Sequence, residues 1–169
     1  MLHKQKRLHL SRGFTLVELL VVIAIIGILA TLLLLQLGVA RQKARDAARI
    51  SHVNQIRTAV EIYFDDNGSY PATDGAGLAA LLVPKYLTLM PKDPLTAANY
   101  GYTRSPATSP TKYQAWAELE QWAQALNSDS DINSTAGGWT GDTVNGTSDS
   151  KTTGCTSAAN DCVYDTGQN

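Results

Sequence analysis

Apolar side chains fill one long stretch near the start of the chain, from Phe14 to Ala40. Apart from Phe14, this stretch consists of Leu, Val, Ile, Ala and Gly, interrupted only by Thr15, Glu18, Thr31 and Gln36. As an α-helix, its 27 positions are roughly 40 Å long, and the hydrocarbon core of a bilayer is about 30 Å thick. The pattern therefore predicts a helix that can cross a membrane.

The helical pattern continues beyond the apolar stretch with a narrower apolar face. Apolar residues recur there at helical spacing, at Val53, Ile56, Val60 and Phe64. The chain has no proline before Pro71, and residues 65–68 (Asp-Asp-Asn-Gly) are typical of a helix end, because Gly68 readily adopts a positive φ. One helix is thus predicted from Phe14 to about Phe64, with the apolar stripe of its second half buried against downstream residues.

Shorter patterned segments follow this helix. Gly77–Leu82 predicts a short helix, and residues 89–94 are extended and turn-rich because residues before proline avoid the α region. Residues 99–104 and 112–120 predict two strands that residues 105–110 close into a hairpin, although residues 116–122 also fit helical spacing. From residue 127 onward the chain is rich in Ser, Thr, Gly, Asn and Asp, which predicts long loops stabilised by local bonds.

Glu18 is the only charged side chain between Arg12 and Arg41. An unpaired carboxylate in a membrane span costs about 2.5–3.5 kcal/mol, so we expect a partner to meet it. A plain membrane anchor has no need of such an acid. An ordinary secretory signal has a shorter apolar region, and a small-residue cleavage site follows it promptly.

The segment Arg12-Gly13-Phe14-Thr15-Leu16-Val17-Glu18 and the apolar residues after it resemble the class III signal of type IV pilins and type II secretion pseudopilins. The resemblance implies that a prepilin peptidase cuts between Gly13 and Phe14 and methylates the new amino terminus of Phe14. It also implies that Glu18 is the family's characteristic acid, which pairs with the amine of a neighbouring subunit during assembly. The α-amino group that cleavage creates has an ordinary pKa of about 7.7–8.0.

The same resemblance implies the partners and the location of the protein. The expected partners are further copies of the chain in a helical homopolymer, the prepilin peptidase and methyltransferase, and an inner-membrane assembly platform with its ATPase. The precursor is expected in the cytoplasmic membrane, with its basic leader inside, following the positive-inside bias, and its head outside. After assembly, the expected location is an extracellular pilus filament.

Three later segments resemble the major pseudopilin of type II secretion and short type IV pilins: residues 63–71, residues 77–81, and residues 89–94 followed by Tyr100-Gly101-Tyr102. The resemblance implies an α+β fold, in which a long N-terminal α-helix packs on a small antiparallel sheet and a loop-rich C-terminal tail follows. The expected divisions are a cleaved leader (1–13), a transmembrane or filament-core helix (14–40), its amphipathic half (41–66), a globular head (67–126) and the tail (127–169).

The overall charge argues against one class of partner. The chain has 14 Lys and Arg against 15 Asp and Glu, and loss of the four basic leader side chains leaves a net charge near −5. Nucleic-acid binding requires a basic surface instead. We interpret the charged cluster Arg41, Lys43, Arg45, Asp46 and Arg49 as a solvated helix face or a contact with lipid headgroups; DNA capture is an alternative without other support.

The tail contains candidate residues for a disulfide and for a metal site. Cys155 and Cys162 are the only cysteines, and outside the cytoplasm they predict a disulfide. Asp129, Asp131 and Asn133 have the 1-3-5 oxygen spacing that begins calcium loops, although the rest of an EF-hand is missing. Type II secretion major pseudopilins bind calcium through acidic C-terminal loops, so calcium is the one cofactor considered, with solvated or capping carboxylates as the alternative.

No catalytic motif is evident in the sequence, and we expect no enzyme. His52 is expected at an exposed helix position, and Asp65-Asp66 is interpreted as a helix terminus rather than an acid and base pair. The predicted function is that of a prepilin, a structural subunit that polymerises into a type IV pilus-like filament. Two alternatives stay open: the major pseudopilin of a type II secretion system, and a membrane-anchored extracytoplasmic protein that does not polymerise.

Overall fold

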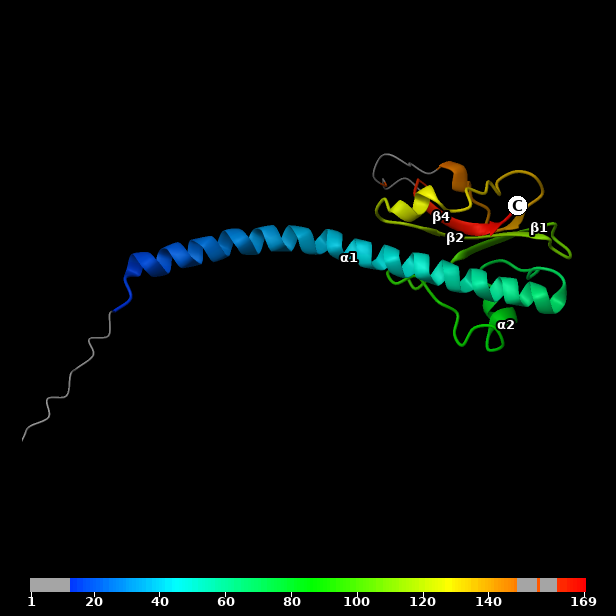
Figure 1. The fold of residues 1–169 in the computed structure, drawn as a ribbon, viewed down its shortest axis with the longest axis horizontal. Helices are drawn as coiled ribbons and strands as arrows, with labels where there is room; N and C mark the ends of the chain where they lie inside the picture. The colour runs from blue at the N-terminus through cyan, green and yellow to red at the C-terminus, as the bar shows by residue number, and fades with distance from the viewer. Residues whose placement is uncertain (1–12, 149–154, 156–160) are drawn as a thin grey trace, which may run out of the picture. The chain divides into compact units, whose positions relative to one another are not determined.

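The computed structural model describes residues 13–148, 155 and 161–169. The predicted leader thus lies outside the described residues except for Gly13. The chain divides into two compact units, the first ending at Val39 and the second comprising Ala40–Asn169. Helix α1, Leu16–Asn67, begins in the first unit and ends in the second (Figure 1).

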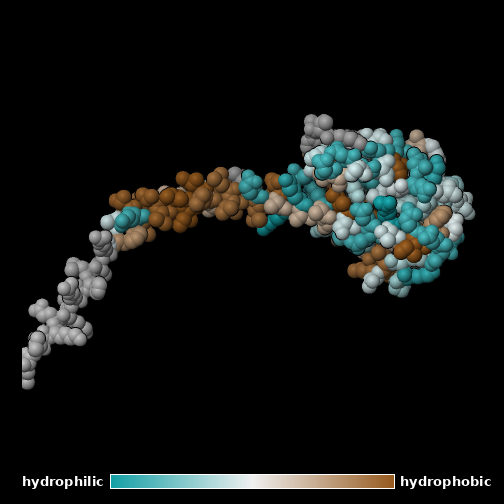
Figure 2. Space-filling model, in the orientation of Figure 1, coloured by the Kyte–Doolittle hydropathy of each residue, from teal (hydrophilic) through white to brown (hydrophobic). Residues whose placement is uncertain are grey.

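The helical residues of the first unit expose their apolar side chains. Val17 is 67%, Ile28 64% and Leu33 70% exposed. Figure 2 shows the resulting band of hydrophobic atoms along this part of α1. By length and composition, α1 is the one helix in the described part of the chain that is suited to cross a membrane. Lipid or other protein chains must cover so much apolar surface.

The predicted end of the long helix is confirmed. Helix α1 extends to Asn67, three residues beyond Phe64, and Gly68 follows with a φ of 72°. The backbone N–H of Gly68 donates to the carbonyl oxygen of Phe64 at 2.7 Å. This left-handed conformation carries little steric cost for glycine, which explains why the helix ends there.

The second unit contains a four-stranded antiparallel sheet in the order β3-β1-β2-β4, which confirms the α+β fold class. Its strands are β1 (Gly101–Ser105), β2 (Lys112–Glu118), β3 (Thr140–Gly141) and β4 (Val163–Gln168). Strands β1 and β2 form the predicted hairpin, in which Gly101 lies opposite Trp116. The described residues also form the predicted short helix α2 (Leu78–Leu82) and two 3₁₀ helices, η1 (Gln124–Asn127) and η2 (Gly146–Ser148).

The second half of α1 and the sheet share one apolar core. Val53, Ile56 and Val60 of the predicted apolar stripe are fully buried, and Phe64, its fourth member, is partly buried. They belong to the same cluster as Tyr102 of β1 and Tyr113 of β2. Residues about one turn apart on a helix lie on the same face. The helical spacing of these residues in the sequence therefore explains why they are buried together.

The tail is loop-rich as expected, but its last residues form β4, which sequence reasoning missed. Strand β4 pairs with β2 over its whole length, from Val163 opposite Glu118 to Gln168 opposite Tyr113. Asp165 in the middle of β4 is fully buried. A buried carboxylate among Thr, Gly and Gln breaks the alternation by which a strand is predicted from sequence.

Candidate functional site

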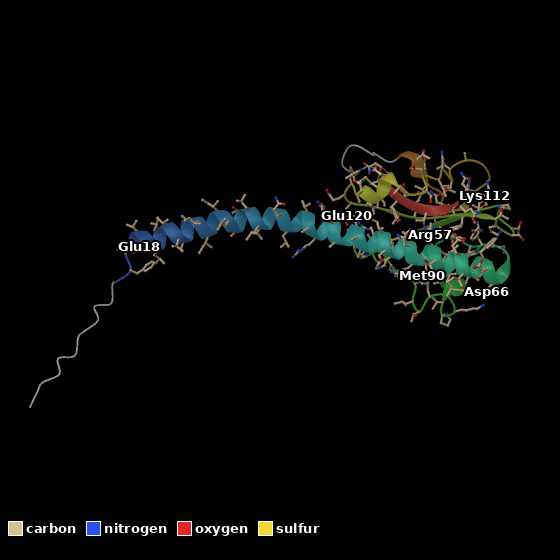
Figure 3. All side chains as sticks on the ribbon, viewed as in Figure 1. Glu18, Arg57, Asp66, Met90, Lys112 and Glu120 are labelled. Carbon is tan, nitrogen blue, oxygen red and sulfur yellow. A yellow bond between two sulfur atoms is a disulfide. The ribbon has the colours of Figure 1, made fainter. Side chains whose placement is uncertain are left out.

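The residues predicted to act in processing and assembly lie at the start of α1. Gly13 and Phe14 precede the helix, and the Phe14 side chain is 74% exposed. Glu18 lies in the first helical turn (Figure 3). The Gly13–Phe14 bond is thus outside regular structure, as a peptidase substrate must be, and its cleavage stays a prediction.

Glu18 forms a reciprocal capping box with Thr15. The backbone N–H and the hydroxyl of Thr15 both donate to Oε2 of Glu18, at 2.8 and 2.7 Å. In return, the backbone N–H of Glu18 donates to Oγ1 of Thr15 at 3.2 Å. Sequence reasoning missed the role of Thr15, although Thr-x-x-Glu before an apolar run is the usual signal of this cap. Among the described residues, no hydrogen bond to the carboxylate uses Oε1, and this oxygen can accept from a second donor.

The charged cluster at 41–49 differs from its prediction. Arg41 and Lys43 are exposed, but the interpretation as a solvated face is wrong for Asp46 and Arg49, which are 3% and 4% exposed. These two side chains lie on one face of α1 because they are three residues apart. They pack against the rest of the second unit instead of facing water or lipid.

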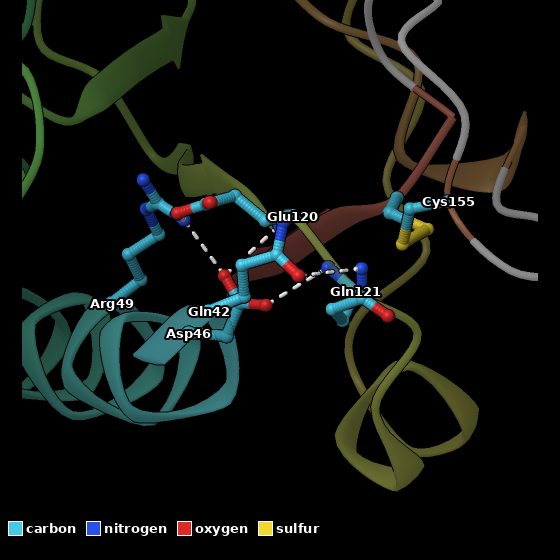
Figure 4. Close-up of a disulfide and its surroundings, with 7 residues drawn as sticks. Gln42, Asp46, Arg49, Glu120, Gln121 and Cys155 are labelled. Atoms are coloured by element: carbon cyan, nitrogen blue, oxygen red, sulfur yellow. Dashed lines mark hydrogen bonds and ion pairs between the residues drawn. A yellow bond between two sulfur atoms is a disulfide. The ribbon is translucent and has the colours of Figure 1, made fainter. Parts of the chain in front are cut away.

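Arg49 is the centre of a buried ion-pair network. Its Nε donates to Oδ2 of Asp93 at 2.6 Å. Its Nη1 donates to Oδ1 of Asp46 and to Oε1 of Glu120, both at 2.7 Å. Figure 4 shows Arg49, Asp46 and Glu120 converging between α1 and the end of β2. Arg45 forms a further paired contact with Glu120.

Backbone groups complete this network. The N–H groups of Glu120 and Gln121 donate to the two carboxylate oxygens of Asp46, each at 2.9 Å. Sequence reasoning missed these contacts because Asp93 and Glu120 are 44 and 71 residues from Arg49, and nothing in a local pattern indicates such pairing. The network ties one helix face to two distant segments of the second unit.

The charges of the network stabilise one another. Burial by itself raises the pKa of Asp93, but hydrogen bonds from Arg49 and from the N–H groups of Thr96 and Leu95 outweigh it and lower that pKa below its usual value. Hydrogen bonds from Arg45 and Arg49 likewise lower the pKa of Glu120, against a smaller effect of burial. Asp93 and Glu120 are therefore ionised at neutral pH.

The predicted disulfide is confirmed. Cys155 and Cys162 are bonded, with their Cα atoms 5.6 Å apart. Cys162 is fully buried, and its carbonyl oxygen accepts a hydrogen bond from the N–H of Leu119 at 2.9 Å. The bond thus anchors the segment before β4 beside the end of β2, while the rest of its loop, 156–160, lies outside the described residues.

The three predicted calcium ligands have other partners. Oδ1 of Asn133 accepts bonds from the N–H and the hydroxyl of Thr135, at 3.0 and 2.7 Å. The N–H of Asp131 donates to the carboxylate of Asp165 at 2.9 Å, and the N–H of Asp165 donates to Asp129 at 3.3 Å. Among the described residues, no three His, Cys, Asp or Glu side chains are grouped to hold a metal ion. Calcium binding by these residues stays a prediction without a preformed ligand set.

Two smaller predictions have different outcomes. His52 is partly buried instead of exposed, and its Nδ1 lies 2.8 Å from the hydroxyl of Tyr100. Asp66 lies in the last turn of α1, as predicted for a helix terminus, and pairs with Lys85 at 2.7 Å. Both residues therefore have structural partners within the second unit.

Known proteins resemble parts of this chain. Residues 8–34 match the model of the prokaryotic N-terminal methylation motif. Type II secretion system core protein G of Vibrio cholerae is 34% identical over 101 residues, which cover 53% of this chain and 68% of that protein. Core protein G of Pectobacterium carotovorum is 37% identical over 106 residues, which cover 62% of this chain and 65% of that protein.

A pilus protein resembles the chain over a shorter segment. The type IV wide pilus major component PilA4 of Thermus thermophilus is 44% identical over 66 residues, which cover 39% of this chain and 50% of that protein. The chain thus spans between half and about two thirds of the length of these relatives. No solved structure matches it significantly.

Proposed function

Because this chain belongs to the family of type IV pilins and type II secretion pseudopilins, we propose that it is a structural subunit that polymerises into a type IV pilus-like filament. The observation that carries the proposal is a single carboxylate, Glu18, in the first turn of a helix whose apolar side chains are exposed. The exposed apolar surface is unfavourable for an isolated chain in water, and the lone acid is unfavourable in a lipid bilayer. In a filament, the helices of neighbouring copies cover this surface.

The capping box supports a specific role for Glu18 in this assembly. Thr15 holds Oε2 of the carboxylate, which leaves Oε1 to accept from an ammonium group. Cleavage after Gly13 removes the basic leader and creates such a group on Phe14. In a medium of low dielectric constant, a carboxylate and an ammonium attract each other far more strongly than in water. The amine of an incoming subunit therefore sets its register against Glu18.

The proposal includes the partners and the location that such a filament needs. The precursor resides in the cytoplasmic membrane through residues 14–40, with the leader inside and the head outside. A prepilin peptidase and methyltransferase processes it, and an assembly platform with its ATPase extracts it into the filament. The apolar length of α1 and the methylation motif at residues 8–34 support this route.

Mass spectrometry combined with electron microscopy tests the proposal. The native protein is expected to begin at N-methylated Phe14 and to occur in sheared filaments. Gly13→Val is expected to retain the leader and to yield no filaments, whereas Gly27→Ala, a glycine substitution in the same segment but away from the cleaved bond, is the control and is expected to lose its leader normally. Filaments built of chains that still begin at Met1 would contradict the proposal.

A second candidate function is the major pseudopilin of a type II secretion system. Several relatives are named core protein G, and they are matched over 48% to 68% of their length, against 50% for PilA4. Deleting the gene separates the two functions: loss of surface filaments with normal protein export supports the pilus, and loss of export with filaments retained supports the pseudopilus. A chain that is never processed at Gly13 would instead be a non-polymerising anchor protein.

A further inference from the structure

Three Asn-x-Ser/Thr motifs, the recognition sequence of N-glycosylation, occur in the chain. They are Asn67-Gly68-Ser69, Asn133-Ser134-Thr135 and Asn145-Gly146-Thr147. A motif of three residues arises easily by chance in a Ser/Thr-rich chain, so the sequence alone does not select among them. The structure separates them, because modification requires an exposed asparagine in a surface loop whose Nδ2 atom a transferase can reach.

Asn67 is poorly placed for modification. It is the last residue of α1, and its Nδ2 donates to the carbonyl oxygen of Tyr63 at 2.7 Å and to the hydroxyl of Tyr86 at 3.2 Å. Attachment of a sugar to this nitrogen would require these hydrogen bonds to break, which costs free energy. The first motif therefore presents its nitrogen to its own helix and to a neighbouring tyrosine.

Asn145 is only partly exposed, and the backbone of its motif is packed. Its neighbours Val144 and Gly146 are buried. Gly146 lies so close to β4 that a Cβ at this position would be 2.6 Å from Oδ2 of Asp165. The last residue of the motif, Thr147, belongs to η2. A transferase would have to displace this segment from β4 in order to surround the motif.

Asn133 lies in a segment whose side chains alternate between the interior and the surface. Ile132 and Ser134 are 2% and 1% exposed, whereas Asn133 and Thr135 are exposed. Successive side chains of an extended segment point to opposite sides, so both recognition residues of this motif lie on the outer side. The N–H of Ser134 donates to the carbonyl oxygen of Val144 at 2.9 Å, which holds the segment in place.

Thr135 orients the side-chain amide of Asn133. Oδ1 of Asn133 accepts from both the N–H and the hydroxyl of Thr135, at 3.0 and 2.7 Å. Among the described residues, no hydrogen bond of Asn133 uses Nδ2, the atom that carries the sugar in an N-glycan. Because Oδ1 and Nδ2 lie on opposite sides of the amide carbon, binding of Oδ1 to Thr135 directs Nδ2 away from this turn.

We propose that Asn133 is an N-glycosylation site, and that the co-substrate is a glycan carried on a polyprenyl diphosphate. Nδ2 forms a bond to C1 of the first sugar while the bond between C1 and the diphosphate oxygen breaks. One amide proton passes to a base of the transferase, and the polyprenyl diphosphate leaves. The proposal rests on the proposed location of the head outside the cytoplasm, but it does not require polymerisation.

One glycan is expected on each chain. Asn145 lies opposite Asn133 in an isolated antiparallel bridge. Side chains in opposite positions of such a pair have Cβ atoms about 4.5–5.5 Å apart, so a sugar on Asn133 leaves no room for a second one on Asn145. The glycan would add a hydrophilic group to the surface of every subunit.

Mass spectrometry of the native protein, isolated from both the membrane and the filament fractions, tests this proposal. Trypsin leaves Asn133 and Asn145 in one peptide, residues 113–151, and Asn67 in another, residues 58–85. The first peptide is expected to carry the added mass of a glycan, and electron-transfer fragmentation is expected to place this mass on Asn133. The second peptide is expected to have its unmodified mass.

Substitutions of threonine separate the motif from the fold. Thr135→Val removes the hydroxyl with little change in size, keeps Asn133 and is expected to abolish the modification. Thr135→Ser, the matched control, keeps a hydroxyl and is expected to be glycosylated. Thr147→Val makes the same change in the motif of Asn145 and is expected to retain the glycan. Both threonines are exposed, so all three variants are expected to fold normally, which near-UV circular dichroism checks.

Three results would overturn the proposal: an unmodified Asn133 in the native chain, a glycan on Thr135 or another hydroxyl, or a glycan retained by Thr135→Val. Glu18→Ala separates this proposal from that of the filament, because its unassembled chains are expected to carry the same glycan. Normal filaments of unmodified chains would overturn glycosylation alone. Glycosylated parent chains that never assemble would overturn the filament alone.

Discussion

The two units of this protein differ in the exposure of their apolar side chains and in the partners of their charged side chains. The first unit has one acid, Glu18, which accepts hydrogen bonds from Thr15 only three residues away, and the described apolar side chains of its helix are exposed. The second unit buries an apolar core, although Leu89 and Leu95 are exposed, and it brings Asp46, Arg49 and Glu120 together from distant segments. The second unit therefore satisfies most of its own core and charged side chains, whereas the first requires lipid or further copies of the chain. That incompleteness is the physical basis of the proposed assembly.

The largest expected effect is on the first unit. Glu18→Ala is expected to leave cleavage and membrane insertion largely intact and to abolish filaments, because the contact with the incoming amine is lost. Electron microscopy of sheared material and mass spectrometry of the membrane fraction measure the two effects. Gln36→Ala, which removes a neutral polar group from the same apolar stretch, is the control and is expected to assemble. Normal filaments from Glu18→Ala would show that the acid has no part in polymerisation.

The next largest effect is expected when a substitution breaks the ion-pair network of the second unit. Arg49→Met leaves Asp46, Asp93 and Glu120 without their shared cation, and removing one partner of a buried ion pair costs about 3–5 kcal/mol. Urea unfolding of the full chain in detergent, followed by near-UV circular dichroism, measures this loss. Arg57→Met changes an exposed arginine of the same helix and is expected to stay within about 0.5 kcal/mol of the parent. Equal effects of the two substitutions would mean that the network contributes little.

The disulfide is expected to contribute less. A bond between residues separated by 7 positions closes a short loop, for which the chain-entropy model gives roughly 2–3 kcal/mol. Replacing both cysteines by serine is expected to lower the free energy of unfolding by about this amount, and thiol titration of the non-reduced parent is expected to detect no free thiol. Two reactive thiols in the parent would contradict the bond.

The smallest and most graded effect is the response to acid. The pKa values of Asp93 and Glu120 are lower in the folded chain than their usual values, so their ionised forms stabilise the fold. This stability is fully present above the unfolded pKa values, near pH 4, and is lost as the pH falls through the folded values. The urea midpoint is expected to be steady between about pH 5 and 7 and to fall below pH 4. If the urea midpoint of Arg49→Met fell with pH in the same way as that of the parent chain, carboxylates outside the network would be responsible for the acid response.

Local patterns were enough for the elements that depend on neighbours in the chain. The end of α1 at Gly68, the buried stripe of Val53, Ile56 and Val60, and the β1–β2 hairpin all follow from spacing or turn chemistry within a few residues. The capping box of Thr15 and Glu18 belongs to the same class, because both members lie within one helical turn. Its signal was present in the sequence and was overlooked.

The amino-acid order alone thus specified a helix of membrane-spanning length, its lone acid and the pair of cysteines. Only the tertiary structure decided that Asp46 and Arg49 are buried, that the segment around Asp165 is a strand, and that Asn133 is exposed while Nδ2 of Asn67 is hydrogen-bonded. The physical reason is the range of the interactions. Helix periodicity and caps act over one or two turns, whereas an ion pair across 71 residues exists only after the sheet has brought its ends together.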